Sequence, residues 1–435
     1  MTSQHVIRSY FLIAGLYTLA AALIWGVNTL FLLAAGLDIF GVFIANAAFT
    51  AGMVVFEIPT GVFADTRGRR ASFLMSIALL CATTLAYVGV AKAHGGLLAF
   101  ATVSVAMGLG FTFYSGAVEA WLVDALKSTG YEGQLDMVFA RGSMVTGVAM
   151  LIGTMGGGLL GSIDLVLPYL IRSGILGAVF LVAFFTMRDL GFCPRALRLA
   201  AIPAEMRSVA QTSIRYGWRR RSVRLLMGFS FLQWGFLTWG FYAWQPYFLE
   251  LLGRDAVWIS GAVAAAIALA TIVGNGVVDW FSQFCGRRTT LLLWASGVQT
   301  AAAVGVGVAG SFWLAVMFFL IVAAAMGVTG PVKQAYIHET VPSGQRASVI
   351  SFDSMIGNAG GVLGQSGLGY LSQARSIAEG YIVGGLATML GFPLLMVLRS
   401  LGERTDIIVG KRAGRGAPCA AQGLPQIAQV DATAR

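Results

Sequence analysis

Ionisable side chains are rare inside the long apolar runs of this sequence, so each one that interrupts a run is a candidate for chemistry. Glu57 does so, within the stretch Phe56-Glu-Ile-Pro-Thr-Gly61. Apolar surroundings favour the protonated form of a carboxyl group, and a proton carrier needs a carboxyl that gains and loses its proton near neutral pH. We therefore predict one of two roles for Glu57. It is either a proton-coupling site, or a structural carboxylate that holds a gate by pairing with an arginine or caps the turn broken by the proline.

A short charged turn, residues 61–70, separates two of the apolar runs. Asp65 lies among three arginines, so the turn can hold an ion pair that a conformational change makes or breaks. Glycines at both ends of the turn allow a tight bend. We predict a conformational latch made of Gly61, Asp65, Arg67, Gly68, Arg69 and Arg70.

Two further carboxylates, Glu119 and Asp124, end another apolar run on either side of Trp121. A position at the end of a run favours pairing with nearby cations over contact with a substrate. We predict that both carboxylates form gate ion pairs. The cations available to them are those of Arg67, Arg69 and Arg141.

Asp353 lies near the start of the eleventh apolar run, where an acidic residue is as unusual as Glu57 is in the second. Its nearest cations along the chain are Arg346 and Lys333. We predict that Asp353 pairs with one of them and is a second candidate for proton coupling.

Aromatic residues are unusually dense in the seventh run, where Trp234, Trp239 and Tyr242 accompany Gln233 and Gln245. Such a set can line a cavity for flat, lipophilic or cationic molecules through stacking and cation–π contacts, or it can be ordinary packing. An asparagine in an apolar run either faces a wet cavity or bonds to another helix. The predicted cavity residues are Trp25, Asn28, Met107, Phe111, Tyr114, Trp234, Trp239 and Tyr242.

Motifs of enzymes and nucleotide-driven pumps are missing from the sequence. It has no G-x-x-x-x-G-K-[ST], H-E-x-x-H or C-x-x-C stretch, and its three histidines are His5, His94 and His338. We therefore predict no enzyme activity, no cofactor and no metal site. Any uphill work would have to come from an ion gradient.

The composition is that of a membrane protein: 57% of the 435 residues are apolar and 11% are charged, against about 25% charged in soluble domains. Runs of about 20 residues or more recur along the chain, enough to cross the roughly 30 Å hydrocarbon core. They predict an all-α fold with twelve spans. These cover roughly residues 9–34, 39–63, 71–91, 96–118, 138–162, 166–187, 223–249, 256–279, 289–309, 312–333, 347–372 and 379–399.

Basic residues cluster in alternate loops. Of the 29 lysines and arginines, only Lys92, Arg172, Arg254 and Arg375 fall on the side opposite the rest. Because basic loops stay in the cytoplasm, this asymmetry predicts that both termini are cytoplasmic and that the chain lies in the cell (inner) membrane. The same distribution explains the net charge of +10: the basic residues set the orientation in the membrane and contact lipid headgroups. We therefore predict no nucleic-acid partner.

The chain repeats itself. Gly286-Arg-Arg288 echoes Gly68-Arg-Arg70, with residues 280–285 inserted before the second copy. The repeat predicts two related six-helix bundles, residues 1–187 and 223–400. Between them, the basic segment 188–222 is predicted to lie on anionic headgroups. Residues 401–435 are predicted to be a disordered tail.

The turn G-x-x-x-D-x-R-G-R-R resembles the signature between the second and third helices of the major facilitator superfamily, a large family of secondary transporters. The resemblance implies two six-helix bundles that rock around a site lined by the first, fourth, seventh and tenth helices. It also implies that the turn stabilises the outward-facing state. Residues 115–124 resemble the fourth-helix end of bacterial drug exporters in this family, while the glycine-rich stretch 153–161 lacks the proline of the exporters' fifth-helix motif.

This resemblance implies proton-coupled export of a small amphiphilic compound, such as a drug or secondary metabolite, by a monomer. The sequence shows no arginine at the middle of a span, which argues against an organic anion as substrate. Three alternatives remain open: uptake of a small nutrient, movement of a lipid-like substrate, and a transport-dead sensor or scaffold.

Overall fold

The first half of the chain folds into a bundle of helices. The computed structural model describes residues 2–192, 207, 211, 214–253, 256–342 and 346–408. In the first bundle the helices are α1 (Ser3–Trp25), α2 (Asn28–Ala34), α3 (Ile39–Arg67), α4 (Arg69–Lys92), α5 (Leu97–Tyr114), α6 (Ala117–Ser128), α7 (Leu135–Gly161) and α8 (Leu167–Thr186).

The second bundle repeats this plan after a short π-helical segment, Ile214–Trp218. Most of the predicted connector and tail lie outside the described residues. The helices of the second bundle are α10 (Arg221–Leu252), α11 (Val257–Gly276), α12 (Val278–Cys285), α13 (Arg288–Val308), α14 (Phe312–Thr340), α15 (Arg346–Ala374), α16 (Ile377–Thr388) and α17 (Gly391–Ser400), followed by a 3-10 turn, Arg404–Asp406.

These helices make twelve crossings within the described part of the chain, as the sequence predicts. Ten segments are long and apolar enough to span a membrane, with α5–α6 and α16–α17 each counting as one. The other two crossings are α10 and α15, of 32 and 29 residues. Their tryptophans, glutamines and serines lower their hydropathy, but both helices exceed the length that a bilayer requires. The all-α prediction of two six-helix bundles is confirmed.

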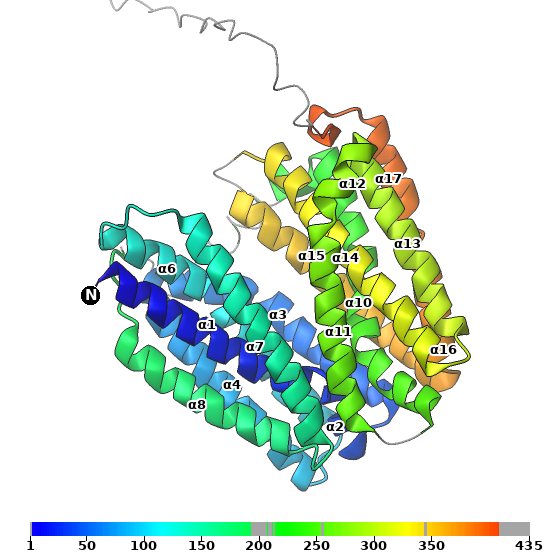
Figure 1. Cartoon of the computed structure of the whole chain (residues 1–435), viewed down its shortest axis with the longest axis horizontal. Coiled ribbons are helices and arrows are strands. Elements are labelled where there is room, and N and C mark those ends of the chain that lie inside the picture. Colours follow the sequence, from blue (N-terminus) through cyan, green and yellow to red (C-terminus); the bar gives the residue numbers. More distant parts are fainter. Residues whose placement is uncertain are drawn as a thin grey trace, which may run out of the picture.

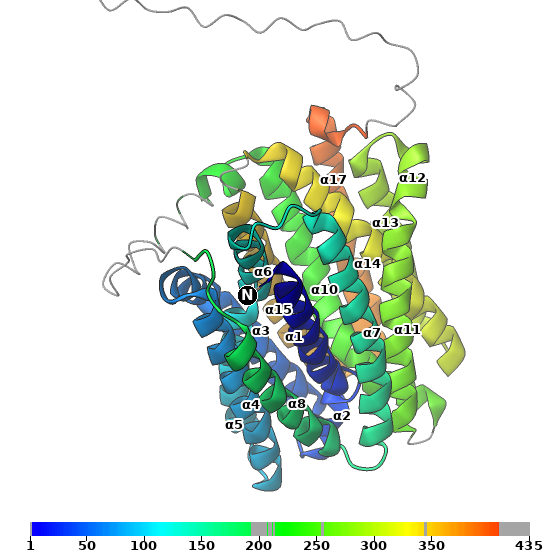
Figure 2. The same ribbon diagram turned by 60° about the vertical axis from the view of Figure 1, so that its left-hand side comes forward.

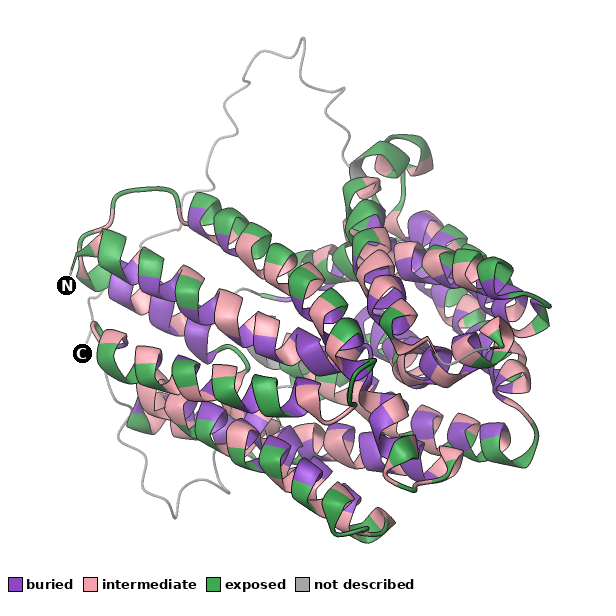
Figure 3. Cartoon of the chain, turned by 60° about the horizontal axis from the view of Figure 1, so that its bottom comes forward, coloured by how far each residue is buried: buried purple, intermediate pink, exposed green. Residues whose placement is uncertain are grey.

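The two bundles converge at one end (Figure 1). We call the end that carries the α3–α4 and α12–α13 turns the basic end, and the opposite end the far end. At the far end α3 packs on α15, and α7 packs on α11. Figure 2 shows α7 running beside α11 from a second direction. The exposed residues lie along the outer sides of the helices (Figure 3), which is the surface that meets lipid in a membrane protein.

Apolar cores hold each bundle together. One cluster fills the first bundle, from Val6 to Met187. The second bundle has two clusters, one around Val223 and Leu398 and a larger one around Trp239 and Tyr381. Phe43 of the first bundle belongs to this larger cluster, so the far end of the molecule has a core shared by both bundles.

Glycines bring the bundles into close contact at the far end. A Cβ atom added to Gly158 of α7 would lie 2.6 Å from the Cα of Gly261 in α11. One added to Gly261 would lie 2.7 Å from the carbonyl oxygen of Thr154. No side chain larger than hydrogen fits between these backbones, so the glycines of α7 allow the two bundles to touch.

Replacing Gly158 by valine should therefore loosen this contact. We expect overpacking to cost about 1–3 kcal/mol and the purified protein to unfold at a lower temperature than the parent. Gly147→Val is the matched control on the same helix, because nothing lies within 4 Å of a Cβ atom at Gly147. Equal unfolding temperatures for the two variants would contradict this packing role.

Candidate transport site between the bundles

The first crossing is broken between α1 and α2, and a side chain from the other bundle fills the break. In an unbroken helix the Thr29 amide would donate to the Trp25 carbonyl. Instead, the Gln245 side chain lies between them. Its Oε1 accepts from the Thr29 amide at 2.9 Å, and its Nε2 donates to the Trp25 carbonyl at 2.9 Å. Gln245 is fully buried. One amide group thus satisfies both backbone groups that the break exposes.

In α10, a backbone carbonyl without a helical partner is satisfied by a side chain of the first bundle. Pro246 has no N–H group, so the Tyr242 carbonyl loses its partner four residues on. The Thr29 hydroxyl donates to that carbonyl at 2.9 Å. Gln245 and Thr29 therefore complete each other's helices across the bundle interface. We call these three hydrogen bonds the reciprocal clamp.

The remaining inter-bundle hydrogen bonds lie at the same end. Gln365 of α15 donates to the Thr50 hydroxyl at 3.1 Å, and the Phe40 amide donates to Gln373 at 3.4 Å. Among the described residues, these two bonds and the clamp are all the hydrogen bonds that join the bundles, and no ion pair joins them. The far end is therefore closed.

Trp234 lies on the face of α10 that points to the other bundle. Gln245, Phe241, Thr238 and Trp234 follow one another at helical spacing, and Phe241 packs on Trp25 with ring centroids 6.1 Å apart. Trp234, three turns from the clamp towards the basic end, is 40% exposed. This is the environment expected of a cavity residue between diverging bundles.

The environment of the other aromatic and glutamine candidates in α10 differs from the prediction. Trp239 is completely buried and packs on Tyr381, Phe236 and Phe43, so the prediction that it lines a cavity is wrong for this structure. Gln233 accepts from Gln299 at 2.6 Å inside the second bundle. Both residues point away from the Trp234 face. The composition of a helix does not show which of its residues face a cavity and which face its own bundle.

Asn28 resolves one of the alternatives left open by the sequence. Its Nδ2 donates to Asn46 at 3.0 Å, and its Oδ1 accepts from the Tyr169 hydroxyl at 2.8 Å. The side chain thus links α2, α3 and α8 within the first bundle. Of the two predicted roles of Asn28, facing a wet cavity or bonding to another helix, the structure shows the second.

The fourth crossing also breaks, between α5 and α6, close to three predicted cavity residues. Tyr114 stacks on Tyr17 with ring centroids 3.7 Å apart. The Phe111 ring is tilted against that of Tyr114 and makes a T-shaped contact with Phe49, and Met107 is buried in the first core. Tyr114 and Phe111 keep partly exposed surfaces. They form an aromatic edge beside the exposed break.

Glu57 has no side-chain partner among the described residues. On α3, Phe43 and Thr50 contact the second bundle, and Glu57 continues the same face seven residues on, about 10 Å nearer the basic end. One turn further, nothing lies within 4 Å of a Cβ atom at Gly61. The half-buried carboxylate therefore lies where the bundles have separated.

The charged turn contains the ion pair that the sequence predicts: Arg69 contacts Asp65 at 2.8 Å. Arg67 is exposed. Gly68 has a φ of 107°, and an added Cβ atom would lie 2.3 Å from a carboxylate oxygen of Asp189. Only glycine fits at this position of the turn, because a larger residue would be strained and would collide with Asp189.

Asp189, which the sequence analysis did not single out, anchors this turn to the first bundle. Its Oδ1 accepts from the backbone amide of Arg70 at 2.9 Å, at the start of α4 where a carboxylate is stabilised. The Arg70 guanidinium donates to the Phe184 carbonyl at 2.7 Å. The turn thus binds the end of α8. Among the described residues it makes no hydrogen bond or ion pair with the second bundle.

Glu119 and Asp124 do not form the predicted gate ion pairs in this structure. No ion pair within the described part of the chain joins either carboxylate to Arg67, Arg69 or Arg141. Glu119 is exposed in the first turn of α6, next to the break in the fourth crossing.

Asp353 pairs with Lys333, one of its two predicted partners, at 2.6 Å. Ser230 joins them: its hydroxyl donates to Asp353 at 2.8 Å and accepts from Lys333 at 2.7 Å. Arg346 donates instead to the Val341 carbonyl at 3.1 Å. Asp353, Lys333 and Ser230, the buried triad, connect α15, α14 and α10.

Arg172 is a buried arginine inside a span, near the start of α8 and away from the middle of that span. It lies in α8, is 7% exposed and forms no ion pair with the described residues. Its buried Nε has no hydrogen-bond partner. Its position within an apolar run was the available signal, but the charge asymmetry of the loops assigned it to a loop.

The described residues contain no cluster of histidine, cysteine, aspartate or glutamate that could hold a metal ion.

Solved structures with this arrangement of helices include transporters. The nucleoside transporter NupG superposes with a TM-score of 0.75 at 10% identity, over 91% of this chain and 99% of NupG. A variant of the peptide transporter POT superposes with a TM-score of 0.69 at 15% identity, over 93% of this chain and 99% of POT. At such identities the likeness concerns the fold alone.

Sequence comparison identifies a curated relative and a family. A D-xylose transporter of Levilactobacillus brevis is 31% identical over 94 residues, which cover 22% of this chain and about a fifth (20%) of that transporter's length. The Major Facilitator Superfamily profile matches residues 10–283 and 258–425, nearly the whole chain. The chain is therefore a multi-pass membrane transporter of the Major Facilitator Superfamily.

Proposed function

We propose that this protein is a proton-driven transporter that works by alternating access and is seen here open at the basic end. The single observation that carries the proposal is that every hydrogen bond between the bundles among the described residues lies at the far end, while the charged turn binds its own bundle. Because basic loops stay in the cytoplasm, we assign the basic end and both termini to the cytoplasmic side of the cell (inner) membrane.

The reciprocal clamp supports a second, outward-open state of comparable free energy. If the bundles separate at the far end, the Thr29 amide can bond to the Trp25 carbonyl, its natural partner in a continuous helix. The Tyr242 carbonyl would then be wetted by the opened cavity. No backbone group needs to stay unsatisfied in hydrocarbon in either state, so the exchange avoids the penalty for burying one.

Glu57 is the proposed proton carrier. It faces the space between the bundles without a cation, so its charge depends on the water that the open basic end admits. Closing that end would bring this face of α3 against the second bundle and favour the neutral form. Asp353 is a weaker candidate in this state, since Lys333 already compensates its charge.

The proposed substrate is a small amphiphilic compound that contacts Trp234 and the Tyr114–Phe111 edge, moved outward as in the drug-exporter branch. Uptake is the second candidate, because the named relatives include nucleoside, peptide and xylose transporters.

Transport into proteoliposomes under an imposed pH gradient tests the coupling and its sign. An antiporter accumulates substrate when the vesicle interior is acidic, since protons leave as substrate enters. We expect accumulation of lipophilic drugs or metabolites in this direction by the parent. Glu57→Gln should lose gradient-driven accumulation while keeping exchange between equal substrate pools.

Glu132→Gln, which changes an exposed carboxylate in the loop before α7, is the control and should transport like the parent. Accumulation only with an acidic exterior would assign symport and favour uptake. Unchanged coupling in Glu57→Gln would remove Glu57 from the mechanism.

Gln245→Leu should weaken the closed far end while keeping the size of the side chain. It removes two hydrogen bonds worth about 1 kcal/mol each, so we expect the open population at the far end to rise by about tenfold or more. Spin labels at Ser162 and Arg375 of a cysteine-free protein would report this as a longer distance. Gln233→Leu removes a buried glutamine of the same helix that bonds within one bundle, and it should leave the distance unchanged.

Asp65→Asn should slow turnover with near-normal expression, because Arg69 then lacks its partner in the proposed latch. Local changes of this kind shift coupling by about 0.5–2 kcal/mol, or about 2- to 30-fold in rate. Glu379→Gln is a matched control, since Glu379 forms a similar helical pair with Arg375 at 3.3 Å at the far end. Parent-like turnover in Asp65→Asn would show that the latch is not used.

A further inference from the structure

The second copy of the charged turn has a different structure from the first. In the first copy, α3 and α4 are separated by Gly68 alone. In the second, residues 280–285, which are inserted relative to the first copy, form most of a separate helix, α12, which follows α11 after a break at Val277. The turn that joins α12 to α13 contains Gly286 and Arg287.

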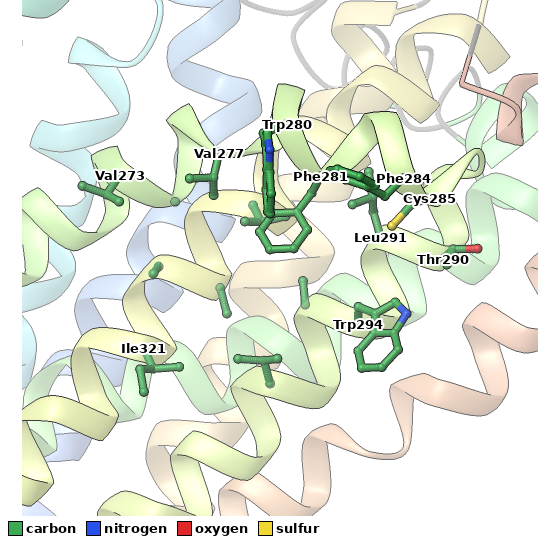
Figure 4. Close-up of a pocket in the computed structure, with 16 residues that line it drawn as sticks. Val273, Val277, Trp280, Phe281, Phe284, Cys285, Thr290, Leu291, Trp294 and Ile321 are labelled. Atoms are coloured by element: carbon green, nitrogen blue, oxygen red, sulfur yellow. The ribbon is translucent and has the colours of Figure 1, made fainter. Parts of the chain in front are cut away.

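An apolar groove lies beneath this insertion (Figure 4). Helices α11 and α13 both pack on α14, and the groove runs between them, with α14 as its floor and α12 at one end. Its volume is about 850 Å³. Aromatic rings from α12 and α13 line it, those of Trp280, Phe281, Phe284 and Trp294. Three of these four side chains are more than half exposed, so the groove opens to the surroundings of the bundle.

The length of the groove matches one leaflet of a bilayer. Along α11 and α12 its lining runs from Val273 to Cys285, and along α13 from Thr290 to Val298. At 1.5 Å per residue these stretches are about 18 and about 12 Å long. One leaflet contributes about 15 Å of hydrocarbon. A lipid acyl chain at the basic end therefore has the length and the chemistry to fill this space.

A free cation lies at the end of the groove where a lipid headgroup would be. Arg287 falls between the lining residues Cys285 and Thr290, is exposed, and forms no ion pair with the described residues. Its neighbour Arg288 is engaged, since it donates to Glu339 at 2.7 Å. A cation at this level attracts the phosphate of an anionic lipid.

We propose that the groove is a binding site for an anionic phospholipid of the leaflet at the basic end, with one acyl chain between α11 and α13 and the phosphate at Arg287. The site belongs to the second bundle only, because only there does an inserted helix separate the two crossings. It depends on the membrane location of the chain and not on the proposed transport cycle.

Native mass spectrometry of the detergent-purified full chain tests this proposal. The probes are phosphatidylglycerol and phosphatidylcholine with identical acyl chains. We expect the parent to bind its first phosphatidylglycerol more tightly than phosphatidylcholine. Arg287→Gln should reduce this preference by about fivefold, and Val298→Trp, which fills the groove, should weaken the binding of both lipids.

Matched controls separate the site from the general lipid surface. Val308→Trp makes the same change on the same helix, at a residue that is 65% exposed and outside the groove. Arg399→Gln removes another exposed arginine at the basic end. Both controls should bind the two lipids like the parent.

Three results would overturn the proposal: equal affinity of the parent for the two lipids, parent-like binding in Val298→Trp, or equal losses in the variants and their controls. Movement of labelled phosphatidylglycerol between leaflets by the parent, abolished in Val298→Trp, would make the groove an entrance for a lipid substrate and overturn a resident lipid. None of these results depends on proton coupling, so failure here is distinct from failure of the proposed function.

Discussion

The reciprocal clamp between Gln245 and Thr29 is the interaction on which this conformation depends. A broken helix in hydrocarbon leaves an amide and a carbonyl without partners, and each costs several kcal/mol if it stays so. Here the break in the first crossing and the proline in the seventh lie opposite each other, and two side chains satisfy three backbone groups. The bundles are joined in this way at the far end, and they diverge towards the basic end (Figure 1).

Charge compensation separates the ionisable residues of the spans into two groups. Asp353 and Lys333 satisfy each other inside the second bundle with the help of Ser230. Glu57 and Arg172 have no such partner among the described residues and belong to the first bundle. A charge without a counter-ion depends on water or on a ligand. These ionisable groups without a counter-ion therefore belong to the first bundle, while the second bundle holds an ion pair.

Features that depend on local sequence could be predicted, and those that depend on distant residues could not. The lengths of the apolar runs predicted the crossings, and the short separation of Asp65 and Arg69 in the sequence predicted their ion pair. The break after α1 could not be foreseen, because the amide that fills it lies 220 residues away in the chain. Trp239 was misplaced because density of aromatic residues does not reveal which side of a helix faces a cavity. Arg172 was overlooked because counting loop charges treats every arginine near a span end as a topology signal.

The two copies of the duplicated turn illustrate how one fold can give its halves different tasks. At Gly68 an acidic side chain occupies the space where a Cβ atom would be, so the turn is packed, and it is bound to the end of α8. At Gly286 nothing lies within 4 Å, and the inserted helix before it leaves α11 and α13 apart over α14. A packed turn transmits the movement of its helices, whereas an open one leaves space for lipid. In the proposed transport cycle the first copy would respond to the conformational change, and with the proposed lipid bound the second copy would anchor its bundle in the bilayer.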